Sequence, residues 1–187
     1  MKPLVMPETS VRGRIRRFIE GNADKLGNDV LEIGSRMTNA NCWWIINRDL
    51  AQGDWIGCDM QEGHGVDVVA DIHNPPEDWL GKFTGILCSE VLEHVARPWV
   101  ALPKIRELLK PDGWLIVTTL TSFPIHGFPD DYYRYTPSGL KILLEDAGFR
   151  NVRTHNEGNI QIKLNDHGEH GFCTRELPLH VFGVAQC

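Results

Sequence analysis

The sequence predicts an α/β fold built on a doubly wound, mostly parallel sheet. Short apolar runs, partly β-branched and bounded by Gly, Asp or Pro, alternate along the chain with amphipathic patterns of helical spacing. Apolar runs of this length are typical of strands that are buried on both faces of a parallel sheet. We expect helices to separate these strands. The predicted strands lie at 29–34, 54–58, 66–70, 83–88 and 113–119.

The composition indicates one globular domain that spans residues 1–187. The chain is 42% hydrophobic and 24% charged, and its net charge of -6 argues against nucleic acid or a membrane surface as a partner. The five cysteines form no closely spaced pair, which favours a reducing, cytoplasmic setting. No apolar run approaches the roughly 20 residues that span a bilayer. An oligomeric state is not specified by these features.

Three helices are predicted. The first lies in the leading segment 1–28, where apolar residues at helical spacing face away from a row of arginines. The second covers 97–110, up to a Lys-Pro-Asp-Gly stop. The third runs from Thr136 to Ala147, because Thr136 is a good cap, a proline follows it and a glycine closes the pattern.

The last part of the chain predicts two more strands, at 151–155 and 181–185. The polar segment 156–176 between them is long for a hairpin connection. Because long connections often carry function, we expect this segment to be a lid, an insertion or a contact for a bound molecule.

Candidate binding residues follow the predicted strands, at the edge where open α/β sheets hold their ligands. Gly34 follows the first strand and lets the backbone approach a ligand closely. Asp59 follows the second strand, where a carboxylate can accept both hydroxyls of a ribose. Asp71 follows the third strand and could accept the exocyclic amine of an adenine that lies over Ile72. Together these residues predict a ligand that contains adenosine.

A series of short motifs carries a resemblance to a known family. In order they are Val-Leu-Glu-Ile-Gly34, Ile-Gly-Cys-Asp59, Val-Ala-Asp71, Ser-Glu-Val-Leu-Glu93-His94, Leu-Lys-Pro-Asp-Gly113 and Tyr-Arg-Tyr-Thr-Pro137. With these motifs the chain resembles the class I S-adenosylmethionine-dependent methyltransferases, especially the small ones that carry a Val-Leu-Glu-His box. The resemblance implies a Rossmann-like sandwich with a seven-stranded sheet whose last strand is antiparallel, and S-adenosylmethionine as the cofactor.

The resemblance also assigns cofactor contacts by position. Gly34 would lie near the amino-acid part of the cofactor, Asp59 on the ribose and Asp71 on the adenine. The family's glycine-rich turn is altered, because Arg36 stands where a second glycine is usual. The candidate cofactor-binding residues are Glu32, Gly34, Asp59, Met60, Asp71, Ile72, Ser89 and Glu90.

The loop after the fifth strand, 120–135, is the predicted acceptor loop. His126 is the candidate base, because a free imidazole pKa of about 6.5 suits proton removal near neutral pH. The tyrosines of the loop could equally pack beneath it, and Glu93 with His94 could be helix-start residues. The expected reaction is in-line methyl transfer to a small-molecule or glycan-type acceptor. The candidate acceptor-binding residues are His94, Asp130, Tyr132, Tyr133 and Tyr135.

Two other functions fit parts of the pattern. A nicotinamide-dependent oxidoreductase also uses a strand, a turn and a later acidic residue, but its Gly-x-Gly-x-x-Gly turn is missing from Gly34 onward. A non-catalytic member of the fold would keep the sheet and act as a binding or scaffolding module. The segment from Asp166 to Cys173 contains acidic, imidazole and thiol side chains, but their spacing matches no zinc motif. We therefore expect no metal site.

Overall fold

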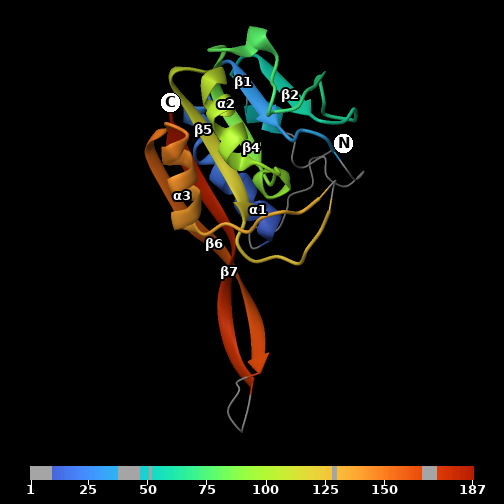
Figure 1. The fold of residues 1–187 in the computed structure, drawn as a ribbon, viewed down its shortest axis with the longest axis vertical. Coiled ribbons are helices and arrows are strands. Elements are labelled where there is room, and N and C mark those ends of the chain that lie inside the picture. Colours follow the sequence, from blue (N-terminus) through green and yellow to red (C-terminus); the bar gives the residue numbers. More distant parts are fainter. Residues whose placement is uncertain (1–9, 38–46, 51, 128–129, 166–171) are drawn as a thin grey trace.

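The computed structural model describes residues 10–37, 47–50, 52–127, 130–165 and 172–187. Their strands form a seven-stranded sheet in the order β3-β2-β1-β4-β5-β7-β6 (Figure 1). β1 to β5 run parallel, and β7 lies antiparallel between β5 and β6. The predicted α/β fold, a mostly parallel seven-stranded sheet with an antiparallel last strand, is confirmed. The strands are β1 Val30–Ile33, β2 Trp55–Asp59, β3 Val68–Val69, β4 Phe83–Ser89, β5 Leu109–Leu120, β6 Arg150–Asn165 and β7 Phe172–Gln186.

Helices cover both faces of the sheet (Figure 1). α1 (Val11–Glu20) lies on one face, while α2 (Pro98–Leu108) and α3 (Pro137–Asp146) lie on the other. Thr136 caps α3, and its Oγ1 accepts a hydrogen bond from the backbone N–H of Gly139 at 3.1 Å. The three predicted helices are therefore confirmed.

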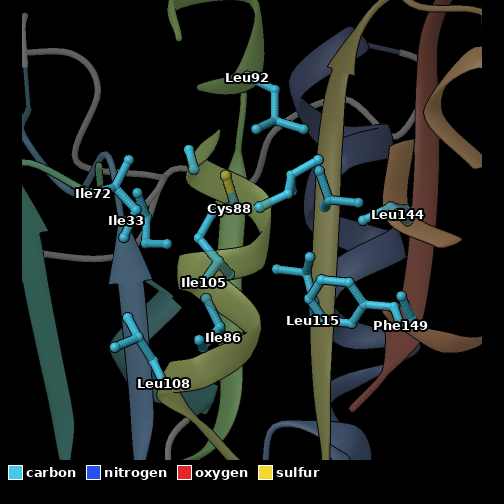
Figure 2. Close-up of a cluster of buried hydrophobic side chains, with 14 of the residues drawn as sticks. Ile33, Ile72, Ile86, Cys88, Leu92, Ile105, Leu108, Leu115, Leu144 and Phe149 are labelled. Carbon is cyan, nitrogen blue, oxygen red and sulfur yellow. The ribbon is translucent and has the colours of Figure 1, made fainter. Parts of the chain in front are cut away.

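Two apolar layers form on the two faces of the sheet because successive strand residues point in opposite directions. Ile86 and Leu115 point toward α2 and α3, where Figure 2 shows Ile105 of α2 against the strands. Their chain neighbours Leu87 and Ile116 belong to the layer beneath α1. All five side chains are at most 1% exposed, and full burial of one such side chain stabilises the fold by about 1.5–3 kcal/mol. In the described chain, both faces of the central strands are filled, so a ligand in this region has access to the strand ends.

Helices do not separate all of the strands, which corrects the expectation from the sequence. Among the described residues, no α-helix lies between the end of β1 and the start of β4. These segments contain only the 3-10 turns η3 (Asn47–Leu50) and η4 (Glu77–Trp79). Helix propensity is low here, because two glycines fall between 60 and 67 and two prolines precede η4. The described chain therefore frames the β2–β3 side of the sheet with loops.

β5 begins earlier than predicted. It starts at Leu109, directly after α2, but its pairing with β4 is interrupted between Leu109 and Trp114. Asp112 in this stretch has a φ of 64°, in the left-handed region. The Lys-Pro-Asp-Gly sequence thus follows the helix as expected, but it forms a bulge inside a strand and not a connecting turn.

The segment 156–176, which the sequence predicted to be a long polar connection, instead belongs mostly to two long strands. β6 and β7 continue pairing well beyond the sheet, for example between Ile160 and Leu177. A signal for the first of these strands is present in the sequence, because Ile160, Ile162 and Leu164 alternate with polar residues. The prediction missed it because the segment was assessed by its overall polarity and not by its alternation.

The outer part of this hairpin projects from the edge where the parallel strands end. Leu120, the last residue of β5, pairs with His180, so β7 before His180 and the paired part of β6 reach past this edge (Figure 1). We call residues 157–165 and 172–179 the β-arm.

Candidate active site

The fold brings together the residues that the sequence singled out. β1 lies between β2 and β4 in parallel register, so that Gly34, Asp59 and Ser89 come at or just beyond the ends of neighbouring strands. Asp59 is paired with Val69 of β3, which places Asp71 two residues beyond the same edge. A ligand at this edge can therefore contact the ends of β1 to β4 at once.

Gly34 makes the tight turn at the centre of this edge. Its φ is 75°, in the left-handed region that favours glycine. A Cβ at this position would lie 2.3 Å from Cγ2 of Val91, so neighbouring atoms also exclude a side chain. The N–H groups of Gly34 and Ser35 both donate to the carbonyl of Cys58, at 2.8 and 3.1 Å. The turn is thereby fixed onto β2.

A small pocket lies beside this turn. Its volume is about 40 Å³, far below the roughly 300–1,000 Å³ of typical ligand pockets. Arg36 is one of its lining residues, and its side chain also packs against Gly63, where a Cβ would lie 2.9 Å from Cγ of Arg36. The arginine that stands in place of the family's second glycine is therefore part of the pocket wall. The pocket is lined by Glu32, Gly34, Ser35, Arg36, Met37, Arg48 and Gly65.

Glu32 forms one wall of the pocket, and a hydrogen bond fixes its side chain. The residue is 6% exposed, and its Oε2 accepts a hydrogen bond from Nε1 of Trp55 at 3.0 Å. Because this bond reaches from β1 to the start of β2, Glu32 supports the turn as well as lining the pocket.

Two carboxylates face solvent on the β2–β3 side. Oδ1 of Asp59 accepts from the N–H of Gln61 at 2.9 Å, and Oδ1 of Asp71 accepts from the N–H and ring Nδ1 of His73 at 2.9 and 2.8 Å. Partial burial acts to raise the pKa of Asp71, but the hydrogen bonds from His73 lower it below its usual value. Among the described residues, no donor binds Oδ2 of either side chain. Each carboxylate is thus oriented by one oxygen and offers the other.

The apolar residues that follow these strands differ in exposure. Ile72 is 7% exposed and packs into the core, whereas Met60 is 60% exposed. A base that stacked at this edge would therefore contact Met60, and little of Ile72 is available for the expected contact with an adenine.

On the other side of Gly34, the end of β4 is tied to β5 and β7. Oγ of Ser89 and Oγ1 of Thr118 are 2.8 Å apart. Glu90 has a φ of 55°, and its Oε2 lies 3.1 Å from Nδ1 of His180. His180 is 3% exposed and comes from the root of the β-arm. No local pattern predicts His180 at this place, because only the antiparallel insertion of β7 brings it to the site.

Glu93 lies buried beneath the acceptor loop. The residue is 0% exposed, and its Oε2 accepts a hydrogen bond from Oγ1 of Thr119 at 2.6 Å. Its Oε1 has no hydrogen-bond partner among the described residues. Burial, and then the negative charge of Glu90, raise the pKa of Glu93 well above its usual value. Glu93 belongs to the 3-10 turn η5 (Leu92–His94) and not to the start of α2.

The two histidines of the site meet above Glu93. The rings of His94 and His126 lie edge to face with centroids 4.9 Å apart. Nδ1 of His94 lies 2.7 Å from the carbonyl oxygen of Asp130, and Nδ1 of His126 lies 3.1 Å from Oδ2 of Asp131. Both oxygens are acceptors, so in the neutral rings the proton belongs on Nδ1 and Nε2 keeps its lone pair.

Asp131 organises the acceptor loop, although it is not among the residues selected from the sequence. Its side chain is 1% exposed and accepts hydrogen bonds from the guanidinium of Arg134 and, at 2.9 Å, from the backbone N–H of His126. The hydrogen bonds from Arg134 hold the pKa of Asp131 far below its usual range. The Asp131–Arg134 spacing was the available signal, but spacing alone does not reveal burial.

The three loop tyrosines divide between packing and exposure. Tyr135 is 5% exposed and donates its hydroxyl hydrogen bond to the carbonyl of Leu92, and the hydroxyl of Tyr133 donates to the carbonyl of Ala96. Tyr132 is 47% exposed. The burial of Tyr135 favours the packing alternative for this residue, while Tyr132 stays accessible to an acceptor.

Comparison with known proteins identifies the family. A family model described as a methyltransferase domain matches residues 8–154, which is most of the chain and includes the ends of β1 to β5. The chain belongs to this methyltransferase family. The resemblance to the S-adenosylmethionine-dependent class is thereby confirmed, and the oxidoreductase alternative finds no support. No curated protein sequence matches this methyltransferase at a significant level.

Solved structures with similar folds agree with the family. An S-adenosylmethionine-dependent methyltransferase from Archaeoglobus fulgidus is 19% identical, with a TM-score of 0.66 over 95% of this chain and 93% of that one. The Burkholderia thailandensis 1,6-didemethyltoxoflavin-N1-methyltransferase is 14% identical, with a TM-score of 0.61 over 94% and 79%. A Haemonchus contortus phosphoethanolamine N-methyltransferase is 14% identical, with a TM-score of 0.58 over 77% and 38%. These identities establish a shared fold.

The described chain bears on three further expectations from the sequence. Within the described ranges, no helix is both long and apolar enough to cross a membrane.

The described cysteines Cys58, Cys88 and Cys187 are free thiols, and burial raises the pKa of Cys58 to about 12. The segment from Asp166 to Cys173 lies mostly outside the described residues.

Proposed function

We propose that this methyltransferase transfers a methyl group from S-adenosylmethionine to a polar small molecule or a sugar-derived acceptor. One observation carries the proposal: two chemically different groups of side chains flank Gly34 on one sheet edge. The open carboxylates of Asp59 and Asp71 lie on the β2–β3 side, and the imidazole of His126 lies on the β4–β5 side. A cofactor whose nucleoside is bound by Asp59 and Asp71 would direct its opposite end toward His126.

The first group suits the adenosine part of the cofactor. A carboxylate oxygen of Asp59 would accept hydrogen bonds from the ribose, and Asp71 would accept from the adenine. Bound S-adenosylmethionine supplies a methyl group on a positively charged sulfur. The chain has to hold the acceptor in line with that methyl group, and such positioning alone can provide most of the acceleration.

The second group suits acceptor binding and proton removal. Oδ2 of Asp131 lies 3.1 Å from Nδ1 of His126, which leaves Nε2 as the nitrogen that can take a proton. The side chain of His126 is 41% exposed, so an acceptor can reach it. Phe123 lies beside it, with ring centroids 5.2 Å apart, and Phe123 and Tyr132 are both more than 40% exposed. Exposed rings next to a base suit a molecule with a polar group on an apolar body, such as a sugar derivative.

The similar structures support a small acceptor. The Burkholderia thailandensis enzyme contains 1,6-didemethyltoxoflavin together with S-adenosylhomocysteine, and the Haemonchus contortus enzyme contains phosphomonomethylethanolamine together with S-adenosylhomocysteine. We further propose that the β-arm, which leaves the sheet at the same edge, forms a wall or lid of the acceptor site. The free thiols are consistent with the proposed cytoplasmic setting.

Calorimetric titration with S-adenosylhomocysteine tests the proposal. We expect saturable binding to the wild type, and binding weakened by about 10- to 150-fold in Asp59→Ala, because a charge-assisted hydrogen bond worth about 1.5–3 kcal/mol is lost. Asp146→Ala, an exposed aspartate on α3, is the matched control and should bind like the wild type. Absence of binding to the wild type, or equal binding to Asp59→Ala, would overturn the assignment.

A further inference from the structure

We propose that Glu93, His94 and His126 form a binding site for a divalent transition-metal ion. One potential ligand atom from each of the three residues lies within 4.8 Å of the other two. η5 supplies Glu93 and His94, and the loop after β5 supplies His126. The sequence predicted no metal site because no local ligand spacing joins these segments.

The burial of Glu93 gives an independent reason to expect a cation. Glu93 is 0% exposed, and its Oε1 has no hydrogen-bond partner among the described residues. No lysine or arginine in the described chain forms an ion pair with it. Burial disfavours the ionised form of Glu93 when no cation is present, whereas a bound dication would stabilise that form and supply the missing contact.

Both histidines have an oxygen acceptor at Nδ1. Nδ1 of His94 is engaged by the carbonyl oxygen of Asp130, and Nδ1 of His126 faces the carboxylate of Asp131. Metal-bound histidines nearly always direct their second nitrogen at a carbonyl or carboxylate in this way, which fixes the ring and leaves Nε2 for the metal. Asp130 and Asp131 therefore act as positioning residues for the proposed site.

The ligand set selects the class of metal. Two imidazoles and one carboxylate suit Zn²⁺, Mn²⁺, Fe²⁺ or Co²⁺, whereas Mg²⁺ and Ca²⁺ prefer oxygen ligands alone. In tetrahedral geometry, metal–ligand distances of about 2.1 Å place the ligand atoms about 3.4 Å from one another. The three ligand atoms, now within 4.8 Å of one another, therefore have to approach by up to about 1.4 Å. Three protein ligands leave positions open for an oxygen of another molecule.

The consequence for catalysis rests on the proposed function. With a metal bound, Nε2 of His126 is a ligand and no longer a base. An acceptor hydroxyl on an open metal position would lose its proton to solvent more easily, because a bound cation lowers its pKa. Its oxygen would then form the bond to the methyl carbon while the carbon–sulfur bond breaks, and the sulfur leaves as a neutral thioether. The metal site therefore favours oxygen acceptors.

Titration of chelator-treated full-length protein with ZnCl₂ tests the site. We expect one equivalent of Zn²⁺ to bind, and binding to weaken by about 100-fold or more in Glu93→Gln and in His126→Ala. Asp131→Asn should weaken it by about 10- to 100-fold, because it perturbs a ligand without removing one. The partly exposed His126 allows this test even if a change at buried Glu93 impairs folding. Equal binding by the wild type and His126→Ala would overturn the proposal.

Two control variants distinguish this site from binding at other histidines of the chain. His64→Ala removes an exposed histidine elsewhere and should leave the affinity unchanged. A double variant, His167→Ala with His170→Ala, tests the rival segment near residue 170, and loss of Zn²⁺ in this variant alone would also overturn the proposal. The titration is done without cofactor, and the S-adenosylhomocysteine titration is repeated with EDTA. The metal site and the proposed function can therefore fail separately.

Discussion

The two halves of the candidate site are built by different means. The cofactor half, at the ends of β1 to β3, depends on backbone shape: Gly34 adopts a left-handed turn, and the carboxylates of Asp59 and Asp71 are oriented by backbone N–H groups two residues away. The acceptor half, formed by η5 and the loop after β5, depends on buried carboxyl groups. Glu93 accepts from Thr119 of β5, and Asp131 accepts from Arg134 and the backbone of His126 within the same loop.

Because of this difference, the two halves should tolerate different kinds of substitution. Local turns survive the loss of one side-chain contact but not a change of backbone conformation. A buried charge network tolerates neither a missing partner nor a missing charge. The acceptor half should therefore be more sensitive to charge substitutions, and the cofactor half to added bulk.

The largest effect is expected for Gly34→Ala. A methyl group here would meet Val91 at 2.3 Å and require a left-handed alanine. The free energy of unfolding should fall by about 2–4 kcal/mol. Chemical denaturation measures this, and Gly34→Ala combined with Val91→Ala should recover part of the loss, because the nearest remaining contact would be Cβ at 3.6 Å. Absence of any recovery would show that backbone strain alone is responsible.

The second-largest effect is expected for Asp131→Ala, which alters the acceptor half. It removes a buried partner from Arg134 and from the backbone of His126, which should lower the free energy of unfolding by about 2–3 kcal/mol. Affinity for S-adenosylhomocysteine should stay within about threefold, because Asp131 lies outside the cofactor half. Comparison of unfolding and calorimetry on the same variant tests the separation. A parallel loss of cofactor affinity would contradict it.

Arg36→Ala tests whether bulk limits binding in the cofactor half. Truncation of Arg36 enlarges a pocket of about 40 Å³, and the affinity for S-adenosylhomocysteine should rise by about 3- to 10-fold, or roughly 1 kcal/mol. Arg12→Ala, on the exposed side of α1, provides the matched control. Weaker binding in Arg36→Ala would mean that the arginine contacts the cofactor.

The smallest effect is expected for Asp71→Asn. The hydrogen bonds from His73 lower the pKa of Asp71, so its ionised form stabilises the fold at pH values above the unfolded value of about 3.9. This contribution is lost as the pH falls through the lower folded pKa. Because the side chain is half exposed, the difference from Asp71→Asn should stay below about 1 kcal/mol at pH 7 and vanish at pH values below the folded pKa of Asp71. Thermal unfolding of both proteins at pH 7 and through the acid range measures it.

Much of the cofactor half could be predicted from the sequence. Its residues follow strands whose apolar runs are clear, and parallel strands carry their end residues to one edge regardless of what connects them. The burial of Ile72 could not be predicted, because an apolar residue beside a strand end has the same pattern whether it faces a ligand or the core. The β-arm could have been predicted in part, because Ile160, Ile162 and Leu164 alternate with polar residues as in a strand, but its pairing far beyond the sheet depends on the tertiary structure.

By itself, the sequence determined the α/β class, the three helices and the placement of Gly34, Asp59 and Asp71 at strand ends, because these depend on local periodicity, capping and strand direction. Only the tertiary structure decided that Glu93, His94, His126 and Asp131 meet, and that His180 joins Glu90. Contacts between distant segments depend on strand order and register, which no local pattern encodes.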